Sequence, residues 1–431
     1  MGEPVVVEIE KLVQGGDGLA RLDGRTLFVR GAVPGEQVEV RLGRARGQYQ
    51  EAAVQRVMKA SPDRVDPPCD LYGRCGGCQF QHLSYESELH WKKEILLETL
   101  IRVGKIEVSP MPAVVPSPSE YGSRGVVRFG LLRQGSGFAL GLHQEGSAKL
   151  LAVTDCLLLP AVLREQVSLL QARLKSMASL GCLVHSIELR SSSTFDQTLM
   201  IVRTDAAHQR AIGPVTELAQ RLPDLVGQVV LGERGGREQR WVERQDWIAE
   251  RLDDMLFRIG DRSFMQSNWA VTKSLVRTVI EWIEPNIGLR VLELFAGVGT
   301  LGLPLAKRGS LVTLVESNPW ASADARRTTK GNHIGRCRFR VAPVERFLAT
   351  EEPMDYDVIL LDPPRTGLSW DCVQGLLRAQ AARVLYVSCD PPTLARDLRR
   401  LLDGGYRIAR LQAFDMFPRT AHLEALVELQ R

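Results

Sequence analysis

The chain has 431 residues, of which 44% are apolar and 25% are charged, so about three domains with separate hydrophobic cores are expected. This composition excludes a disordered chain, and no apolar run approaches the roughly 18 residues that span a bilayer. With 55 basic and 51 acidic residues, the net charge is only +4, so bulk charge does not indicate a nucleic-acid partner.

Eight cysteines are too sparse for a disulfide scaffold, and clustered cysteines in a reducing compartment are more often metal ligands or nucleophiles. Residues 1–4 lack the basic and apolar regions of a secretory signal. We therefore expect a cytoplasmic protein with no membrane partner, able to act as a monomer.

Residues 4–58 contain short stretches that predict β-strands, namely VVVEI, GLARL, RTLFVRGAV, QVEVRL and EAAVQRV. They predict a small OB-like β-barrel over residues 1–60. Its arginines, with Phe28 and Tyr49 available for stacking, suit RNA binding, although a solvated surface would carry the same residues. The stretch GDGLARLDGRTLFVRGAVPGE resembles a TRAM domain, an RNA-binding barrel found in RNA-modifying enzymes.

A proline-rich linker at 61–68 precedes the cysteine region, and the apolar spacing over 84–102 predicts a helix with one apolar face. After a second linker at 109–122, mixed strand and helix patterns continue to about residue 260. Residues 61–260 are therefore expected to form a central α+β domain.

Four cysteines form a three-plus-one arrangement, because Cys69, Cys75 and Cys78 lie in one loop and Cys156 lies far downstream. Zinc sites usually use two close pairs, whereas three thiolates from one loop and a fourth from elsewhere commonly hold a [4Fe-4S] cluster. The glycines between Cys75 and Cys78 let the loop fold around a bulky group. We expect an iron-sulfur cluster, with zinc as the alternative. The remaining cysteines outside the candidate active site, Cys182, Cys337 and Cys372, fit small apolar side chains in a core.

From residue 290 onwards, apolar strands alternate with helical stretches, which predicts a doubly wound, Rossmann-like α/β domain over 261–431. Strand VLELF runs into a short glycine loop with Gly297 and Gly299, and the next strand ends in Glu316. A glycine loop followed by an acid that accepts hydrogen bonds from ribose hydroxyls indicates an adenosine ligand. Because no phosphate-binding lysine is present, S-adenosylmethionine fits better than ATP or a dinucleotide.

Two more strand ends meet the same ligand edge. Asp362 is followed by two prolines that would fix its carboxylate toward a base edge, although it could instead cap a turn. Cys389 precedes two prolines and a helix start, where a positive helix terminus would favour the thiolate. Glu424 stands at the entrance to the final strand and is the candidate base, a solvated glutamate being the alternative.

Thiolate addition at carbon six of a pyrimidine activates carbon five for methylation, and a base must then remove the carbon-five proton. The blocks CDLYGRCGGCQFQH, FMQSN, LELFAGVGTLGLPLA, LDPPRTG, YVSCDPPTLARD and FPRTAHLE together resemble the S-adenosylmethionine-dependent RNA uracil-5-methyltransferase family. The segment around Arg124 matches a more basic family segment only loosely.

The resemblance implies roles for individual residues. Cys389 would be the nucleophile and Glu424 the proton acceptor, and the target uracil would leave its stack to reach them. Cofactor-pocket positions would be Gln266, Phe295, Thr300, Glu316 and Asp362, and cluster ligands Cys69, Cys75, Cys78 and Cys156. The combination of barrel and cluster resembles the branch acting on 23S ribosomal RNA more than the transfer RNA branch.

Rival functions remain open at this point. Exocyclic-amine methyltransferases use a similar aspartate-proline-proline loop but need no nucleophilic cysteine. Cytosine-5 methylation of RNA shares the thiol chemistry, and only the resemblance argues against it. A noncatalytic iron-sulfur RNA-binding protein would have no use for Cys389 and Glu424.

Overall fold

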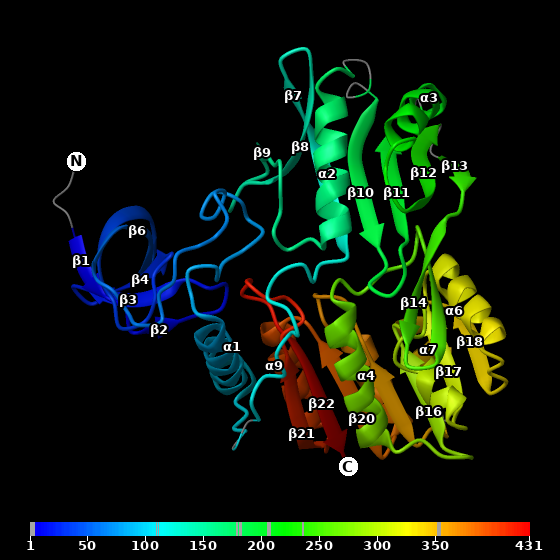
Figure 1. Ribbon diagram of the computed structural model, residues 1–431. Coiled ribbons are helices and arrows are strands. Elements are labelled where there is room, and N and C mark those ends of the chain that lie inside the picture. The colour runs from blue at the N-terminus through cyan, green and yellow to red at the C-terminus, as the bar shows by residue number, and fades with distance from the viewer. Residues whose placement is uncertain are drawn as a thin grey trace.

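The computed structural model describes residues 5–431 except 109, 111, 178–179, 181–182, 205–207, 235–236 and 351–354. Within these residues, three large sheets and one two-stranded hairpin follow one another along the chain. Figure 1 shows the N-terminal sheet in blue, the central sheet in cyan and green, and the C-terminal sheet in yellow to red. None of the described helices has the length and apolar character needed to cross a bilayer.

The N-terminal sheet has the order β1-β5-β6-β4-β3-β2 and surrounds one apolar cluster to which every strand except β2 contributes. All the predicted strands are present. The short β2 was not predicted, because two residues carry no periodic pattern. Within residues 5–59 no ladder joins β1 to β2, so closure of the barrel stays a prediction. The strands are β1 Val5–Glu8, β2 Lys11–Leu12, β3 Gly18–Leu22, β4 Arg25–Arg30, β5 Gln37–Arg46 and β6 Tyr49–Lys59.

The predicted helix is α1, Tyr85–Thr99, which continues into the π-helical turn η1, Leu100–Gly104. It begins where it does because the Ser84 side chain accepts a hydrogen bond from the backbone N–H of Ser87. Its buried face packs into the C-terminal core beside α9, Pro391–Asp403. Helix α1 thus belongs by packing to the C-terminal part, although its sequence position lies in the predicted central domain.

The central sheet has the order β13-β12-β11-β10-β7-β8-β9 and is antiparallel except for the β11–β12 pair. Helices α2 and α3 share one apolar cluster with it, which agrees with the predicted α+β class. Its elements are β7 Val126–Gln134, β8 Gly137–His143, β9 Leu150–Ala152, α2 Ala161–Leu174, β10 Val184–Ser191, β11 Thr198–Thr204, α3 His208–Ala219, β12 Leu225–Arg234 and β13 Arg237–Arg244.

A hairpin, β14 Trp247–Leu252 and β15 Met255–Gly260, connects the central and C-terminal sheets. The Gly260 N–H donates to the Asp324 carboxylate at 2.9 Å, and the Arg258 N–H donates to the Thr328 hydroxyl at 3.0 Å. Both acceptors lie on α6, Pro319–Gly331. Packing therefore continues across the boundary that the sequence predicts between residues 260 and 261.

The C-terminal sheet has the order β18-β17-β16-β19-β20-β22-β21. The first five of these are parallel, and β22 runs antiparallel between β20 and β21. Helices cover both faces, as Figure 1 shows, and the two faces hold separate apolar clusters. The elements are α4 Trp269–Ile283, β16 Arg290–Leu294, α5 Leu303–Lys307, β17 Leu311–Glu316, β18 Cys337–Val341, α7 Val344–Thr350, β19 Val358–Leu361, α8 Trp370–Ala379, β20 Arg383–Ser388, β21 Arg407–Phe414 and β22 Glu424–Gln430.

The predicted doubly wound sheet is therefore present. Strands β18 and β21 were not predicted. Edge strand β18, with sequence CRFRV, alternates arginines with less polar residues and leaves much of its surface exposed, unlike the apolar runs of the central strands.

Candidate active site

Cys389 and Glu424 meet at one edge of the C-terminal sheet. Cys389 directly follows β20, Glu424 is the first residue of β22, and the ladder pairs Ser388 with Ala425. Because β22 runs antiparallel to β20, the start of one strand lies beside the end of the other. This edge is also the carboxyl edge of the parallel strands, where ligands of such sheets bind.

Asp362 completes an acidic pair with Glu424. Burial raises the pKa of the Asp362 carboxyl to about 7. Burial also raises the pKa of Glu424, which is 3% exposed, and the charge of Asp362 raises it further. Two carboxylates that share a buried site do not both ionise readily, so this edge favours the protonated form of at least one of them.

The electrostatics around Cys389 differ from the expectation. Burial, followed by the nearby Glu424 carboxylate, raises the pKa of the Cys389 thiol to about 11. The positive end of α9 is capped instead by Asp390, whose carboxylate accepts from the Thr393 N–H at 3.0 Å. Burial thus favours the neutral form of Cys389, and the Asp390 cap occupies the helix terminus, so a thiolate stabilised by that terminus stays a prediction.

Arg365 is a site residue that the sequence reasoning did not assign. Its guanidinium lowers the pKa of Cys389 through its charge and a hydrogen bond, and its charge also lowers that of Glu424. It directly follows the Asp362-Pro363-Pro364 motif. The sequence signal that could have identified Arg365 was a basic residue following Asp362 and the two prolines at the ligand edge of the sheet.

The glycine loop after β16 has the backbone geometry that the sequence suggested. Gly297 and Gly299 have φ of +53° and +79°, and Phe295 has the strained value of +58°. A Cβ at Gly299 would stand 2.7 Å from Leu303 Cγ, whereas one at Gly297 would meet no atom within 4 Å. The loop therefore packs tightly at Gly299 and leaves open space beside Gly297.

Glu316, at the end of β17, ties this loop to its neighbour. Its carboxylate accepts from the Gly297 N–H at 2.8 Å and from the Asn318 N–H at 2.7 Å. The Asn318 side chain donates to the Arg262 carbonyl at 2.8 Å, which brings the segment 261–268 to the same edge.

That segment carries Gln266. The remaining predicted cofactor position, Thr300, follows the glycine loop directly. Gln266, Phe295, Thr300, Glu316 and Asp362 are all half-buried.

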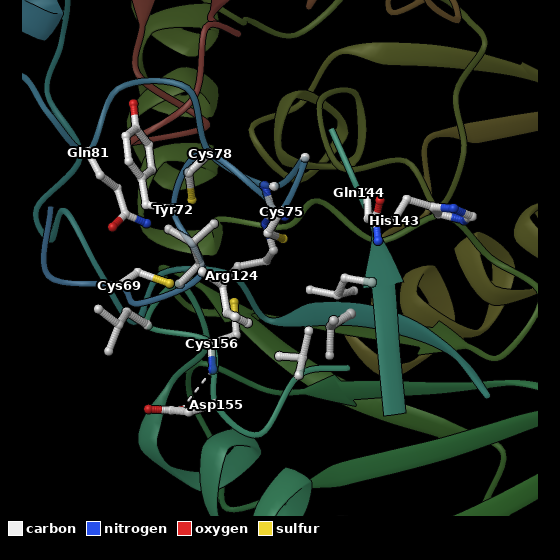
Figure 2. A pocket seen from close by; sticks show the side chains of 18 of the residues that line it. Cys69, Tyr72, Cys75, Cys78, Gln81, Arg124, His143, Gln144, Asp155 and Cys156 are labelled. Carbon is white, nitrogen blue, oxygen red and sulfur yellow. Dashed lines mark hydrogen bonds between the residues drawn. The ribbon is translucent and has the colours of Figure 1, made fainter. Parts of the chain in front are cut away.

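All four predicted cluster ligands line one cavity of about 330 Å³. Figure 2 shows Cys69, Cys75, Cys78 and Cys156 there, with Arg124 among the lining side chains. They are free thiols. The cysteine loop is held against the end of β8, because the Gly76 N–H donates to the His143 carbonyl at 3.0 Å.

The thiols are close enough to influence one another. The pKa of Cys78 is raised to about 12, mainly by burial; the charges of Cys156 and Cys75 also raise it, whereas a hydrogen bond with Gln81 and the charge of Arg124 lower it. The pKa values of Cys75 and Cys156 are also raised, mainly by burial. In the part of the chain that the structure describes, no three His, Cys, Asp or Glu side chains converge as the ligands of a single metal ion do.

The other cysteines divide between the interior and the surface. Cys372 is buried, as expected for a core side chain, and Cys337 is half-buried in edge strand β18. Cys182 lies outside the described residues.

A doubly wound sheet with a glycine loop, an acid after the next strand and a thiol beside buried carboxylates defines a nucleotide-binding enzyme domain of the methyltransferase class. The sequence matches the family described as tRNA (Uracil-5-)-methyltransferase over residues 85–431 and the TRAM domain over residues 1–54. The chain belongs to the tRNA (uracil-5-)-methyltransferase family and carries an N-terminal TRAM domain.

Full-length relatives are similar throughout. An uncharacterized RNA methyltransferase of Gloeobacter violaceus is 34% identical over 448 aligned residues, covering 100% of this chain and 97% of the relative. The 23S rRNA (uracil(1939)-C(5))-methyltransferase RlmD of Pseudomonas putida is 35% identical, covering 99% and 93%. The crystal structure of Pyrococcus abyssi tRNA (uracil-54, C5)-methyltransferase with S-adenosyl-L-homocysteine superposes with a TM-score of 0.77 at 28% identity, covering 98% and 99%.

Gly299→Ala should lower the affinity for S-adenosylmethionine about tenfold or more, because a Cβ at this positive φ would strain the backbone and press on Leu303. Titration calorimetry measures this. Gly331→Ala is the matched control, since a Cβ there meets no atom within 4 Å. Equal affinity of Gly299→Ala and wild type would show that the loop does not shape the cofactor pocket.

Arg365→Gln should raise the pKa of the Cys389 thiol, because the guanidinium stabilises the thiolate. The rate of Cys389 alkylation by iodoacetamide, measured against pH with Cys389→Ser as blank, should therefore rise at higher pH than in wild type. In Arg365→Lys, which keeps the positive charge, the pH dependence of Cys389 alkylation should shift less than in Arg365→Gln. An unchanged or downward-shifted profile would contradict this electrostatic assignment.

Proposed function

We propose that this protein is a 23S ribosomal RNA uracil-5-methyltransferase that forms 5-methyluridine through a covalent bond between Cys389 and the base. The observation that carries the proposal is the meeting of Cys389, Glu424 and Asp362 at the ligand edge of the sheet. A half-buried thiol beside a carboxylate base is the pair that this reaction requires.

The residues at the cofactor edge fit S-adenosylmethionine, which supplies an electrophilic methyl group when bound. The open space beside Gly297 admits a ligand, and Glu316 retains lone pairs for ribose hydroxyls beyond the two N–H groups it already accepts. The residues proposed to hold the cofactor are Gln266, Phe295, Gly297, Gly299, Thr300, Glu316 and Asp362.

In the proposed reaction, the Cys389 thiol loses its proton to solvent and its sulfur bonds to carbon six of the uracil. Arg365 assists by stabilising the thiolate. Electrons displaced from the carbon five–carbon six double bond make carbon five nucleophilic, so that it would bond to the methyl carbon of the donor as the donor's sulfur–methyl bond breaks and its sulfur keeps the electron pair. The Glu424 carboxylate then takes the carbon-five proton, the double bond reforms, and the Cys389 sulfur leaves with its electron pair. The raised pKa of Glu424 makes it a stronger base once it is ionised.

Ribosomal RNA is the favoured substrate because RlmD relatives match this chain nearly end to end. Transfer RNA is the second candidate, supported by the name of the superposed Pyrococcus enzyme. Either RNA would meet a hollow of about 550 Å³ between the N-terminal sheet, helix α1 and Pro392. The rings of Phe28 and Tyr49, with centroids 5.3 Å apart and planes tilted by 57°, line this hollow and offer aromatic surface for unstacked bases.

A [4Fe-4S] cluster is the proposed occupant of the cysteine cavity, with zinc as the alternative. Four thiols line this cavity, and the three-plus-one arrangement of the cysteines in the sequence is the one that commonly holds such a cluster. A cluster held by Cys69, Cys75, Cys78 and Cys156 would cross-link the cysteine loop to the segment after β9. Its proposed role is to fold the central part and shape the RNA surface.

We further propose a cytoplasmic monomer divided at residues 1–60, 61–260 and 261–431. The first sheet ends at Lys59, which supports the first boundary.

Incubation with S-adenosylmethionine and RNA that contains 5-fluorouridine should give a denaturant-resistant protein–RNA adduct, because fluorine at carbon five cannot leave as a proton. Gel electrophoresis detects the adduct, and mass mapping of the trapped RNA identifies the uridine. Cys389→Ala should give none, whereas Cys337→Ala should behave as wild type. Methyl transfer that survives in Cys389→Ala would contradict the covalent mechanism.

Glu424→Gln should accumulate a methylated covalent complex on ordinary RNA, because the carbon-five proton then has no acceptor. Denaturing gels with radiolabelled methyl donor measure this. Rapid turnover in the variant would show that another group is the base.

Anaerobically purified full-length protein should be brown and carry about four iron atoms per chain. Cys156→Ser should lose iron, while Cys337→Ser, outside the cavity, should keep it. Metal analysis and visible absorption decide between the alternatives, since a colourless protein that releases zinc on acidification would contradict the cluster.

A further inference from the structure

A cluster of fully buried charges lies between α1 and the loop that precedes Glu424. The Lys92 ammonium contacts the Glu88 carboxylate at 2.7 Å and the Asp415 carboxylate at 2.5 Å, and all three side chains have 0% exposure. Lys92 also donates to the Phe417 carbonyl at 3.0 Å. The Tyr85 hydroxyl donates to the second oxygen of Asp415 at 2.7 Å.

Arg419 extends this cluster along the same loop. Its backbone N–H donates to Glu88 at 2.7 Å, and its guanidinium donates to the Leu83 carbonyl at 2.8 Å. Its carbonyl accepts from the N–H groups of Gln79 and Phe80, both at 3.1 Å. These bonds hold Arg419 at φ +66°, a left-handed conformation that is unfavourable without such support.

The loop held in this way, residues 415–423, joins β21 to β22. The last pair of the ladder between these strands is Phe414 with Glu424. Asp415 directly follows Phe414, the partner of Glu424 in that pair. The contact of Lys92 with Asp415 therefore fixes the loop beside the first residue of β22, which is the proposed base. Lys92 on helix α1 and Asp415 in the loop are 323 residues apart in the sequence.

Stability alone is a poor reason for this arrangement. Buried ion pairs pay a large desolvation penalty, and apolar side chains of similar volume often stabilise a core at least as well. Directional contacts to two carboxylates and a carbonyl instead fix the position of each partner. The same loop carries His422, two residues before Glu424, whose pKa is lowered first by burial and then by the charges of Arg365 and Lys92.

We propose that Lys92 is a positioning residue for the proton-transfer step, acting with Glu88 to hold the 415–423 loop so that Glu424 faces carbon five of the bound uracil. This inference rests on the proposed function. Addition of Cys389 and methyl transfer precede proton removal, so they depend less on the loop.

The experiment compares two rates in the full-length protein. The adduct rate on 5-fluorouridine RNA reports thiol addition and methyl transfer, whereas turnover on uridine RNA also requires proton removal. In Lys92→Met, the ratio of turnover to adduct rate should fall about tenfold or more. A methylated covalent complex should accumulate on uridine RNA, as expected for Glu424→Gln. If Lys92→Met does not fold, the same two rates are measured in Asp415→Asn, which keeps the side-chain size. The ratio of turnover to adduct rate should fall in that variant too.

Glu86→Gln is the matched control, because Glu86 lies on the same helix but is exposed and stands outside the hollow proposed to meet RNA. In this control variant, the ratio of turnover to adduct rate should equal that of wild type. The inference would be overturned if both rates fell in parallel in Lys92→Met or if their ratio did not change. It would also be overturned if the ratio fell equally in the control, or if neither Lys92→Met nor Asp415→Asn folded. Absence of any adduct in wild type would instead overturn the proposed function.

Discussion

The antiparallel ladder between β20 and β22 is the constraint on which the candidate site depends. Its pairing of Ser388 with Ala425 leaves Cys389 and Glu424 side by side where the strands meet the ligand edge. A one-residue slip would turn each side chain of β22 to the opposite face of the sheet. The register is set by apolar side chains of β22 that pack into both faces of the sheet, so the core and the site are fixed together.

Burial then decides the chemistry of this edge. The same dry surroundings that exclude water raise the pKa values of Asp362, Cys389 and Glu424. Arg365 is the cation whose charge opposes this effect at both Cys389 and Glu424. Burial therefore favours the neutral forms of these three groups, and the guanidinium favours the charged forms of Cys389 and Glu424.

Segments from the whole chain converge on the loop before Glu424. Helix α1 contributes Lys92 and Glu88, and the cysteine loop contributes Gln79, whose side chain accepts from the Ala421 N–H at 3.2 Å. The turn of the N-terminal sheet approaches closely as well, since a Cβ at Gly16 would stand 3.2 Å from that of Ala421. The cysteine loop, the N-terminal sheet and the sheet edge that carries Glu424 thus all contact one loop.

The sequence by itself determined strands β16, β17, β19 and β20 of the parallel sheet, the glycine loop, helix α1 and the grouping of four cysteines in one cavity. These follow from local patterns, namely apolar periodicity, turn residues and strand ends that share an edge. Only the tertiary structure decided the burial that raises the pKa of Cys389, the place of Arg365 beside it and the packing of α1 against the C-terminal sheet. Burial and contacts between residues hundreds of positions apart set these properties, and no local pattern records the distance between two side chains that meet only after folding.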